Sequence, residues 1–419
     1  MTTAASAAAR NPVLAWILYD VAAHGYTLMI PGVAYAIYFT SHVAQDHARA
    51  DALWSLAVAL PLVLSGVFAP WIGAVADTSG RRRALLAGAT LACCAATALL
   101  VTVKRGDVAS GIALFVLAQL GYMIAAGLYN SYLPHIAPTR RTANVSGVAW
   151  GLSYVGGIAC LALSLPFTRG GLAPSNVDHF TNTFLVVAAF FLLLGLPAVA
   201  ALPTDTRVAM GSAPAHPYRR IWETLRNWRR EREVPKFLLA FYLVNDAVVT
   251  VIFFTAITLK QSFGLDVQEV LVLSITFQLI AIPATMSFGW LGGRWTQRGA
   301  IYVTLVLWGG TLALLAFAEG RYAPLAIAVA LGLVLGSTQA LFRSLFAIMV
   351  PADRVAEYYG FHALAGRASS AVGPLLFGVV SAATGSPRLA MLSLGIFLIA
   401  GAGVLATVRI PQDTRTDRR

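Results

Sequence analysis

Four ionisable side chains lie deep inside apolar stretches of this 419-residue sequence: Asp20, Asp246, Arg343 and Arg367. The two arginines flank a short polar turn at 351–356, eight residues before its start and eleven after its end. On helices that rise 1.5 Å per residue, they would lie roughly 12 and 16 Å from the turn. That depth is near the middle of a hydrocarbon core about 30 Å thick. A charge there is costly unless it faces a partner or water, so we expect a polar cavity walled by these arginines.

The two aspartates are predicted to lie at the same depth as the arginines. Asp20 is about eight residues into an apolar run at 13–39, and Asp246 about ten residues into a run at 237–260. Buried carboxylates and guanidiniums at one level can carry protons and bind anionic solutes. They can also form static ion pairs that hold helices together. The sequence leaves open which aspartate faces which arginine.

Further polar side chains interrupt the same apolar runs and are predicted to extend the cavity. Gln339 lies one helical turn before Arg343 and should face the same way. His24 and His362 could carry protons because imidazole titrates near neutral pH, although a hydrogen-bonded structural role is the alternative. The complete set of predicted solute and ion pathway residues is Asp20, Asp246, Arg343, Arg367, Tyr19, His24, Asn130, Tyr154, Asn245, Gln278, Gln339 and His362.

The composition is that of an integral membrane protein with many spans. Hydrophobic residues make up 58% of the chain and charged residues only 11%, against about 25% charged in soluble proteins. The net charge of +12 would suggest nucleic acid in a soluble protein. Here the basic residues sit mostly in short loops, so the charge reports topology and no nucleic-acid partner is expected. The three cysteines lie in apolar runs without metal-site spacing, and we expect no metal.

Twelve apolar runs are long enough to span a bilayer. We place them at 13–39, 52–76, 84–103, 110–136, 144–167, 183–202, 237–260, 267–291, 300–318, 323–350, 357–382 and 388–408. With the N-terminus inside, 21 of the 30 Lys and Arg residues fall in cytoplasmic segments and seven in outer loops. The excess of basic residues on one side predicts that both termini are cytoplasmic.

The runs divide into two halves. We predict an N-terminal six-helix bundle (1–202), a cytoplasmic linker (203–236), a C-terminal six-helix bundle (237–408) and a cytoplasmic tail (409–419). The linker either contains an amphipathic interfacial helix around 221–228 or is simply a solvated basic linker. The halves repeat at an offset of 213 residues, which places Asn130 opposite Arg343 and Tyr154 opposite Arg367. Parallel six-helix repeats of this kind characterise the major facilitator fold.

The loop after the second run carries a specific motif, GAVADTSGRRR at 73–83. It resembles the major facilitator signature G-x-x-x-D-x-x-G-R-[RK]-[RK] throughout. The resemblance implies a cytoplasmic gate formed by Gly73, Asp77, Gly80, Arg81 and Arg82. The corresponding segment of the second half, GWLGGRWTQR at 289–298, has glycine in place of the aspartate.

Segments from both halves narrow the resemblance. AWILYDVAAHGY (15–26), FLLAFYLVNDAVVT (237–250) and EYYGFHALAGRASSAVGPLLFG (357–378) are similar to the vacuole-effluxer-like branch of the superfamily. That branch includes autophagy-related vacuolar amino-acid exporters and many bacterial proteins. The resemblance implies a secondary active transporter that moves a small solute by alternating access, with export of amino acids. The arginines of the predicted cavity also suit related carboxylate-bearing metabolites, because guanidinium forks bind carboxylates. We expect a proton or solute gradient to supply the energy, with protons as the coupling ion, because the sequence has no nucleotide-binding loop.

Other functions remain as alternatives to this prediction. They are drug or metabolite efflux on the same fold, or a transporter-like sensor or scaffold. A membrane enzyme is disfavoured because no catalytic triad, metal cluster or paired catalytic carboxylates occur at workable spacing. We expect no cofactor, a monomer in a bacterial inner (plasma) membrane, and a small-molecule solute, protons and the lipid bilayer as partners.

Overall fold

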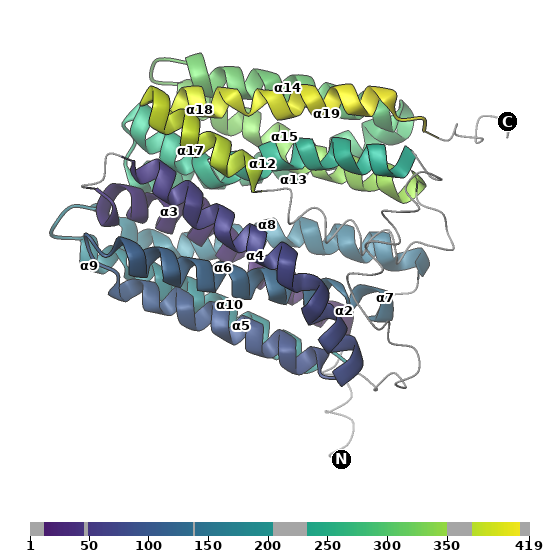
Figure 1. Cartoon of the computed structure of the whole chain (residues 1–419), viewed down its shortest axis with the longest axis horizontal. Coiled ribbons are helices and arrows are strands. Elements are labelled where there is room, and N and C mark those ends of the chain that lie inside the picture. Colours follow the sequence, from purple (N-terminus) through teal and green to yellow (C-terminus); the bar gives the residue numbers. More distant parts are fainter. Residues whose placement is uncertain (1–11, 46–48, 137–138, 204–232, 350–370, 411–419) are drawn as a thin grey trace, which may run out of the picture.

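The described residues of the computed structural model, 12–45, 49–136, 139–203, 233–349 and 371–410, form an all-helical bundle. Eleven helical segments among them are long and apolar enough to cross a membrane, and Val372–Thr384 is a shorter apolar helix. Two groups of helices lie one above the other in Figure 1, one from each half of the chain. This is the predicted major facilitator fold of two pseudo-symmetric six-helix bundles.

The first span is broken by two wide helical turns. It consists of α2 (Pro12–Thr27), a π-helical turn (η1, Leu28–Val33), α3 (Ala34–Tyr38) and a second π-helical turn (η2, Phe39–Val43). Pro31 lies within the first of these turns. Proline has no N–H to donate and crowds the preceding turn, which favours such a local widening.

The remaining helices of the N-terminal half follow the predicted runs to within a few residues. They are α4 (Ala50–Ser79), α5 (Arg82–Leu99), η3 (Leu100–Thr102), α6 (Val108–Asn130), α7 (Leu133–Ile136), α8 (Thr139–Thr168), α9 (Val177–Phe180) and α10 (Asn182–Ala201). Within this half, α2 packs on α8 and α10, and α5 packs on α6 and α10.

The C-terminal half repeats the pattern. Its helices are α12 (Glu233–Phe263), α13 (Val267–Arg294), α14 (Gln297–Phe317), α15 (Ala323–Met349), α17 (Val372–Thr384), α18 (Pro387–Ser393) and α19 (Gly395–Thr407). Helix α12 begins at Glu233, inside the segment predicted as linker. Most of that linker, and with it the predicted amphipathic helix, lies outside the described residues, as does 350–370.

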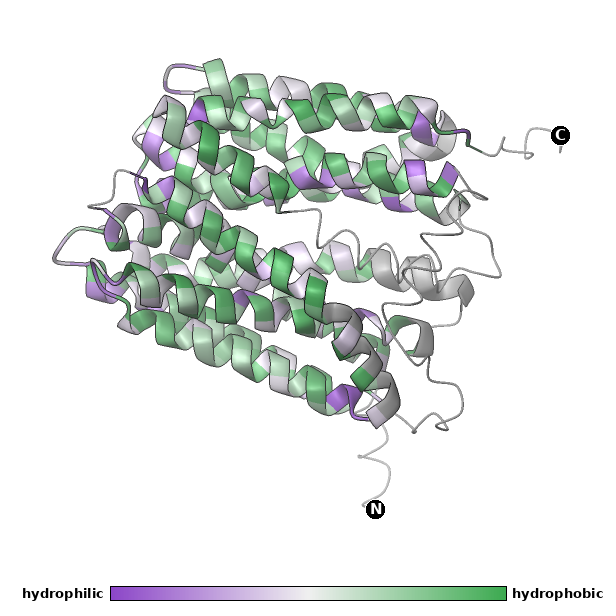
Figure 2. Ribbon diagram, viewed as in Figure 1, coloured by the Kyte–Doolittle hydropathy of each residue, from purple (hydrophilic) through white to green (hydrophobic). Residues whose placement is uncertain are grey.

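The outer faces of the bundle are apolar. Large hydrophobic side chains such as Leu193, Val306 and Ile399 are more than two-thirds exposed. In Figure 2 hydrophobic residues cover most of the helix lengths, whereas hydrophilic residues gather toward the two ends. Exposed apolar surface on this scale is unfavourable in water and favourable against lipid, so the chain is an integral membrane protein.

The two ends of the bundle are distinguished here by the chain termini. The terminal side is the end where α4 and α10 finish, α12 begins and α19 finishes. The far side is the end where α4 begins and α12 and α17 finish. Contacts between the halves come from α4 with α17, α8 with α13, and α12 with η1 and α3. The ribbons of the two halves meet at the far side and diverge toward the terminal side in Figure 1.

In each half, one arginine in the first turn of a helix, Arg83 in α5 and Arg298 in α14, bonds the end of the last span. Arg83 donates to the carbonyls of Ala200 and Leu202, at 3.4 and 3.3 Å, where α10 ends. Arg298 donates to three carbonyls at the end of α19, with distances of 2.7 Å to Leu405, 2.5 Å to Ala406 and 3.2 Å to Val408. The last carbonyls of a helix lack internal partners and carry partial negative charge, so a guanidinium is well suited to them.

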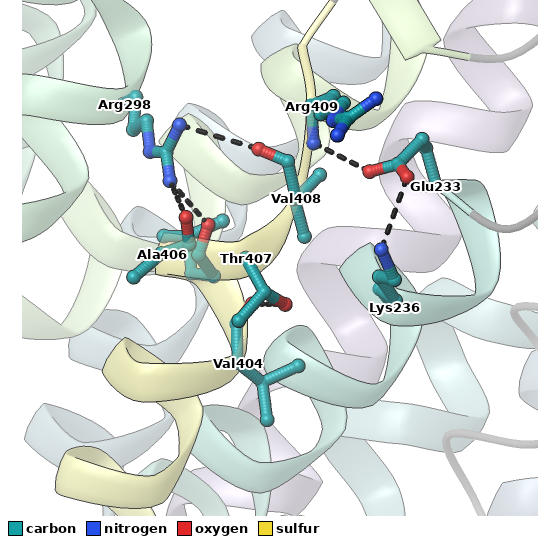
Figure 3. A network of polar contacts seen from close by, with 9 residues as sticks. Glu233, Lys236, Arg298, Val404, Ala406, Thr407, Val408 and Arg409 are labelled. Carbon is teal, nitrogen blue, oxygen red and sulfur yellow. Dashed lines mark hydrogen bonds and ion pairs between the residues drawn. The ribbon is translucent and has the colours of Figure 1, made fainter.

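A neighbouring contact joins α12 to the same helix end (Figure 3). The carboxylate of Glu233 accepts from the Nζ of Lys236 at 3.0 Å and from the backbone N–H of Arg409 at 2.5 Å. The terminal-side ends of α12, α14 and α19 are therefore linked by polar contacts.

Glycines allow some helices to pack at backbone distance. A Cβ at Gly332 in α15 would lie 2.7 Å from both the Cβ of Ile280 and the carbonyl oxygen of Phe277 in α13. By contrast, a Cβ at Gly309 in α14 would meet nothing within 4 Å. Small residues at helix contacts are the usual device for close approach in membranes.

We expect Gly332→Ala to destabilise the purified protein by about 1–3 kcal/mol, because the added methyl group overpacks the α13–α15 contact. Gly309→Ala is the matched control and should be neutral or stabilising, since alanine is the better helix former. Thermal unfolding in detergent measures both. Equal midpoints for the two variants would contradict the packing argument.

We expect Arg298→Gln to lower the thermal midpoint by about 2–5 °C, through loss of about 1–2 kcal/mol of interaction with the end of α19. Arg321→Gln is the control, because Arg321 is an exposed far-side residue whose guanidinium lies over the Tyr322 ring at 5.8 Å. A midpoint that moves no more in Arg298→Gln than in Arg321→Gln would argue against a capping role.

Candidate solute and ion pathway

Arg343 projects from α15 toward the opposite half of the molecule. Its guanidinium carbon lies 5.0 Å from the centre of the Trp150 ring, which belongs to α8. Arg343 is exposed and Trp150 is partly buried. An arginine over the face of a tryptophan is attracted by the electron-rich ring, with a free energy of about 0.5–1 kcal/mol at exposed sites. The contact bridges the two halves.

Asp20 lies in α2, in the same half as Trp150, and is partly buried. Arg343 is close enough to Asp20 for its positive charge to act on the carboxylate. Three groups of different chemistry therefore meet where the halves face each other: a guanidinium, an indole ring and a carboxylate. This cluster, Asp20, Trp150 and Arg343, is called the central cluster below.

Asp246 is placed differently from Asp20. It is 3% exposed in the middle of α12, and its Oδ2 accepts from the backbone N–H of Gly373 at 2.9 Å. Gly373 lies in the first turn of α17, where N–H groups have no partner within the helix. Among the described residues, Oδ1 of Asp246 has no hydrogen-bond partner. Asp246 therefore joins α12 to α17 within the C-terminal half.

Asn245 and Gln339 form a second polar contact in this half. The amide Nε2 of Gln339 donates to Oδ1 of Asn245 at 3.0 Å. Both side chains are partly buried, and Gln339 lies one turn before Arg343 on α15. The hydrogen bond holds two amides in fixed positions close to the arginine.

His24 and Gln278 meet across the two halves near the middle of the bundle. A Cβ at Gly157 of α8 would lie 2.6 Å from Oε1 of Gln278 and 2.7 Å from Cδ2 of His24. Gln278 is fully buried, and its Nε2 donates to the carbonyl of Ser274 at 3.3 Å. The rings of His24 and Tyr154 meet edge to face with centres 5.3 Å apart. The absence of a side chain at Gly157 makes room for this cross-half contact.

Two of the predicted pathway residues are placed elsewhere. Tyr19 is 1% exposed, bonds Thr90 Oγ1 through its hydroxyl at 2.8 Å and stacks on Tyr129 inside the N-terminal half. Asn130 is exposed at the last residue of α6, on the terminal side. Arg367 and His362 lie outside the described residues.

The predicted gate loop is partly described. Gly80 ends α4 with φ of 62°, a left-handed conformation that glycine adopts without strain. Arg82 lies over the ring of Tyr132, with its guanidinium carbon 5.6 Å from the ring centre, and Arg81 is exposed. Gly73 and Asp77 lie in α4, but the contacts they make are outside what the structure describes.

Sequence reasoning missed three residues that the structure brings forward: Trp150, Arg83 and Arg298. Trp150 lies one helical turn before Tyr154, which the repeat did single out. Arg83 and Arg298 end the two segments that the repeat aligns, 73–83 and 289–298, so the alignment contained a signal for their shared role. The roles themselves depend on which helix end each arginine reaches.

The helical architecture and the polar groups between its halves define a transporter of the major facilitator class. The sequence matches the family described as "Vacuole effluxer Atg22 like" over residues 8–417, and the chain belongs to that family. It is 26% identical over 416 residues to the uncharacterized MFS-type transporter YxiO of Bacillus subtilis (strain 168), covering 96% of this chain and 95% of that one. It is 20% identical over 301 residues to autophagy-related protein 22 of Kluyveromyces lactis, covering 67% and 61%.

Solved structures share the fold at low sequence identity. The D-xylose–proton symporter has a TM-score of 0.73 at 17% identity, covering 95% of this chain and 97% of that one. The nucleoside transporter NupG (D323A mutant) has a TM-score of 0.72 at 15% identity, covering 95% and 100%. The chain is therefore a membrane transporter of small solutes, rather than an enzyme.

We expect Asp20→Asn and Arg343→Gln to be energetically coupled in a double-mutant cycle on thermal stability. A coupling of about 0.5–3 kcal/mol is typical of residues in contact or in one polar network. Asp178→Asn and Lys104→Gln provide the control cycle, because this ion pair of 3.2 Å is well exposed to solvent, where water screens the attraction. A coupling no larger than that of the exposed pair would show that Asp20 and Arg343 do not act together.

Proposed function

We propose that this transporter is a secondary active exporter of small carboxylate-bearing metabolites, which works by alternating access and is driven by protons. The observation that carries the proposal is the central cluster. Arg343 is an exposed cation at the junction of the halves, over the ring of Trp150 and within electrostatic range of the carboxylate of Asp20. A guanidinium forks two N–H donors toward a carboxylate, so this cluster suits an anionic group of a solute.

The central cluster also explains how solute binding could drive the change between the two conformations of alternating access. A solute carboxylate competes with Asp20 for Arg343, and the indole face of Trp150 can cover the apolar part of the solute. Because Arg343 belongs to one half and the other two groups to the other half, binding changes the contact between halves. A ligand shifts a conformational equilibrium only through such differential contacts.

Proton coupling is assigned to the two intramembrane aspartates. Asp20 lies beside the proposed substrate arginine, and Asp246 has one carboxylate oxygen without a hydrogen-bond partner among the described residues. Protonation of Asp20 would remove a negative charge between the halves, and protonation of Asp246 would remove one at the start of α17. The comparisons support transport of this kind, since the family is described as vacuole effluxer-like and one solved structure with this fold is a D-xylose–proton symporter.

The orientation follows from the distribution of basic residues. We propose that both termini and the terminal side face the cytoplasm of a bacterium, with the protein in the inner membrane as a monomer. On this assignment the contact of α4 with α17 lies at the outer end of the bundle. The basic residues at 81–83 and 140–141, at the starts of α5 and α8, lie on that side.

Flux in proteoliposomes tests the function. Purified protein is reconstituted and screened with labelled amino acids and organic acids, each paired with its carboxamide analogue, with and without a pH gradient. We expect flux of at least one carboxylate. Flux of its amide should be at least tenfold slower, because loss of a charge-assisted hydrogen bond costs about 1.5–3 kcal/mol. Arg343→Gln should abolish this preference, and Arg343→Lys should retain part of it.

Three outcomes would count against the proposal. Equal flux of acids and amides removes the carboxylate preference and favours broad drug or metabolite efflux. Flux that ignores the pH gradient removes proton coupling. Protein that moves no solute under any gradient favours a sensor or scaffold.

We expect Asp246→Asn to uncouple transport rather than abolish binding. The variant should still exchange labelled for unlabelled solute across the membrane, but accumulation driven by a pH gradient should fall at least tenfold, because asparagine cannot release a proton. Asp178→Asn, an exposed carboxylate on the far side, is the control. Full gradient-driven accumulation in Asp246→Asn would exclude Asp246 as the proton carrier.

A further inference from the structure

At the far side, one carboxylate of the N-terminal half accepts two hydrogen bonds from the C-terminal half. Asp51, in the first turn of α4, accepts from the hydroxyl of Ser381 in α17 at 2.8 Å and from Nε2 of Gln261 in α12 at 3.1 Å. The two carboxylate oxygens are used separately, Oδ2 by Ser381 and Oδ1 by Gln261. Both donors come from the C-terminal half, 330 and 210 residues away along the chain.

The helices that carry this contact are packed at backbone distance. A Cβ at Gly378 of α17 would lie 2.4 Å from Oγ and 2.6 Å from Cβ of Ser55, and 3.4 Å from Cα of Ala52. Ser55 is 2% exposed and lies one turn after Asp51 on α4. The surface of α17 between Gly378 and Ser381 is thus seated directly on the first turns of α4.

The chemistry of the contact is suited to repeated opening. Both donors are neutral, a hydroxyl and an amide, whereas a lysine or arginine would add a full ion pair. Hydrogen bonds to a charged acceptor are stronger than those between neutral groups, and water can replace both donors when the helices separate near the membrane surface. The carboxylate itself would not be left unsatisfied in the open state.

Helix α17 is also held at its other end. Its first turn donates from Gly373 to Asp246, the proposed proton carrier, while its last turns bond Asp51. The helix that seals the far side therefore begins at the intramembrane carboxylate. A change at Asp246 acts on the element that carries the seal.

We propose that Asp51 is a gate residue, whose bonds to Ser381 and Gln261 latch the far side shut and break when that side opens. This inference rests on the proposed alternating access of the transporter. The inference concerns how the far side opens and does not depend on which solute is carried, so it can be tested without a solute. Weakening the latch should expose Ser55, which is covered by α17 only while the far side is closed.

The experiment uses the full chain in lipid nanodiscs, where both faces are accessible and membrane orientation does not matter. Ser55→Cys supplies a reporter thiol, and a bulky polar maleimide measures how often it is exposed. The native cysteines Cys93, Cys94 and Cys160 are all buried, and protein without the reporter gives their background. We expect slow labelling of the reporter alone and at least fivefold faster labelling after Asp51→Asn or Ser381→Ala.

Asp178→Asn in the same reporter background is the matched control. Asp178 is also a far-side carboxylate, but its partner Lys104 belongs to its own half, so labelling should stay within twofold of the parent. Size-exclusion profiles and thermal midpoints confirm that each variant is folded, and Ser381→Ala keeps the test sharp if Asp51→Asn folds poorly.

The latch is overturned if Asp51→Asn and Ser381→Ala label no faster than Asp178→Asn, or if the parent reporter already labels rapidly. The proposed transport function fails separately, as an absence of solute flux in proteoliposomes. Faster labelling without flux would leave the latch in place and remove the transport proposal.

Discussion

Polar groups inside a lipid bilayer must be satisfied by the protein or by enclosed water, and this constraint shapes the whole molecule. Its clearest expression is the cross-half contact of Arg343 with Trp150, within electrostatic range of Asp20. The charged side chains of Asp20 and Arg343 would be costly facing acyl chains, so the helices that carry them are turned toward one another. The outer faces, which meet lipid, are left with residues such as Leu193 and Ile399.

Different kinds of contact hold each half together and join the two halves. Within each half, an arginine caps the end of the last span, Arg83 on α10 and Arg298 on α19. Between halves, the contacts among the described residues include a cation over an aromatic ring, a histidine beside a glutamine, and neutral donors on Asp51. This division suits rigid bundles that move against each other, because the interface can exchange partners without unfolding either half.

Small residues decide where the halves can touch. Gly157 admits Gln278 beside His24, and Gly378 seats α17 on Ser55. At both places a methyl group would collide with atoms of the other half. Close approach increases dispersion contact and excludes lipid, while the polar atoms nearby provide the orientation. Packing and hydrogen bonding thus act at the same positions, and the far side is closed by both.

The sequence by itself determined the class of fold. Apolar runs of membrane-spanning length, basic loops and a repeat at an offset of 213 residues are sufficient for twelve helices in two bundles. The physical reason is that hydropathy and helix length are local properties, because each span must by itself be apolar and long enough to cross the hydrocarbon core. The family resemblance was carried by contiguous motifs for the same reason. It also pointed to Asp20 and Arg343, because an intramembrane charge is visible without a structure.

Only the tertiary structure decided which polar groups meet. The sequence left open which aspartate faces which arginine. In the structure Asp246 bonds the backbone of Gly373, and Tyr19 turns into its own bundle toward Thr90, whereas Arg367 lies outside the described residues. Trp150 and Asp51 carried no local signal, since their partners lie on helices far away in the chain. Side-chain partners across a helical bundle depend on the rotation and tilt of each helix. Those follow from packing against neighbours such as Gly378, and no periodicity along a single segment contains them.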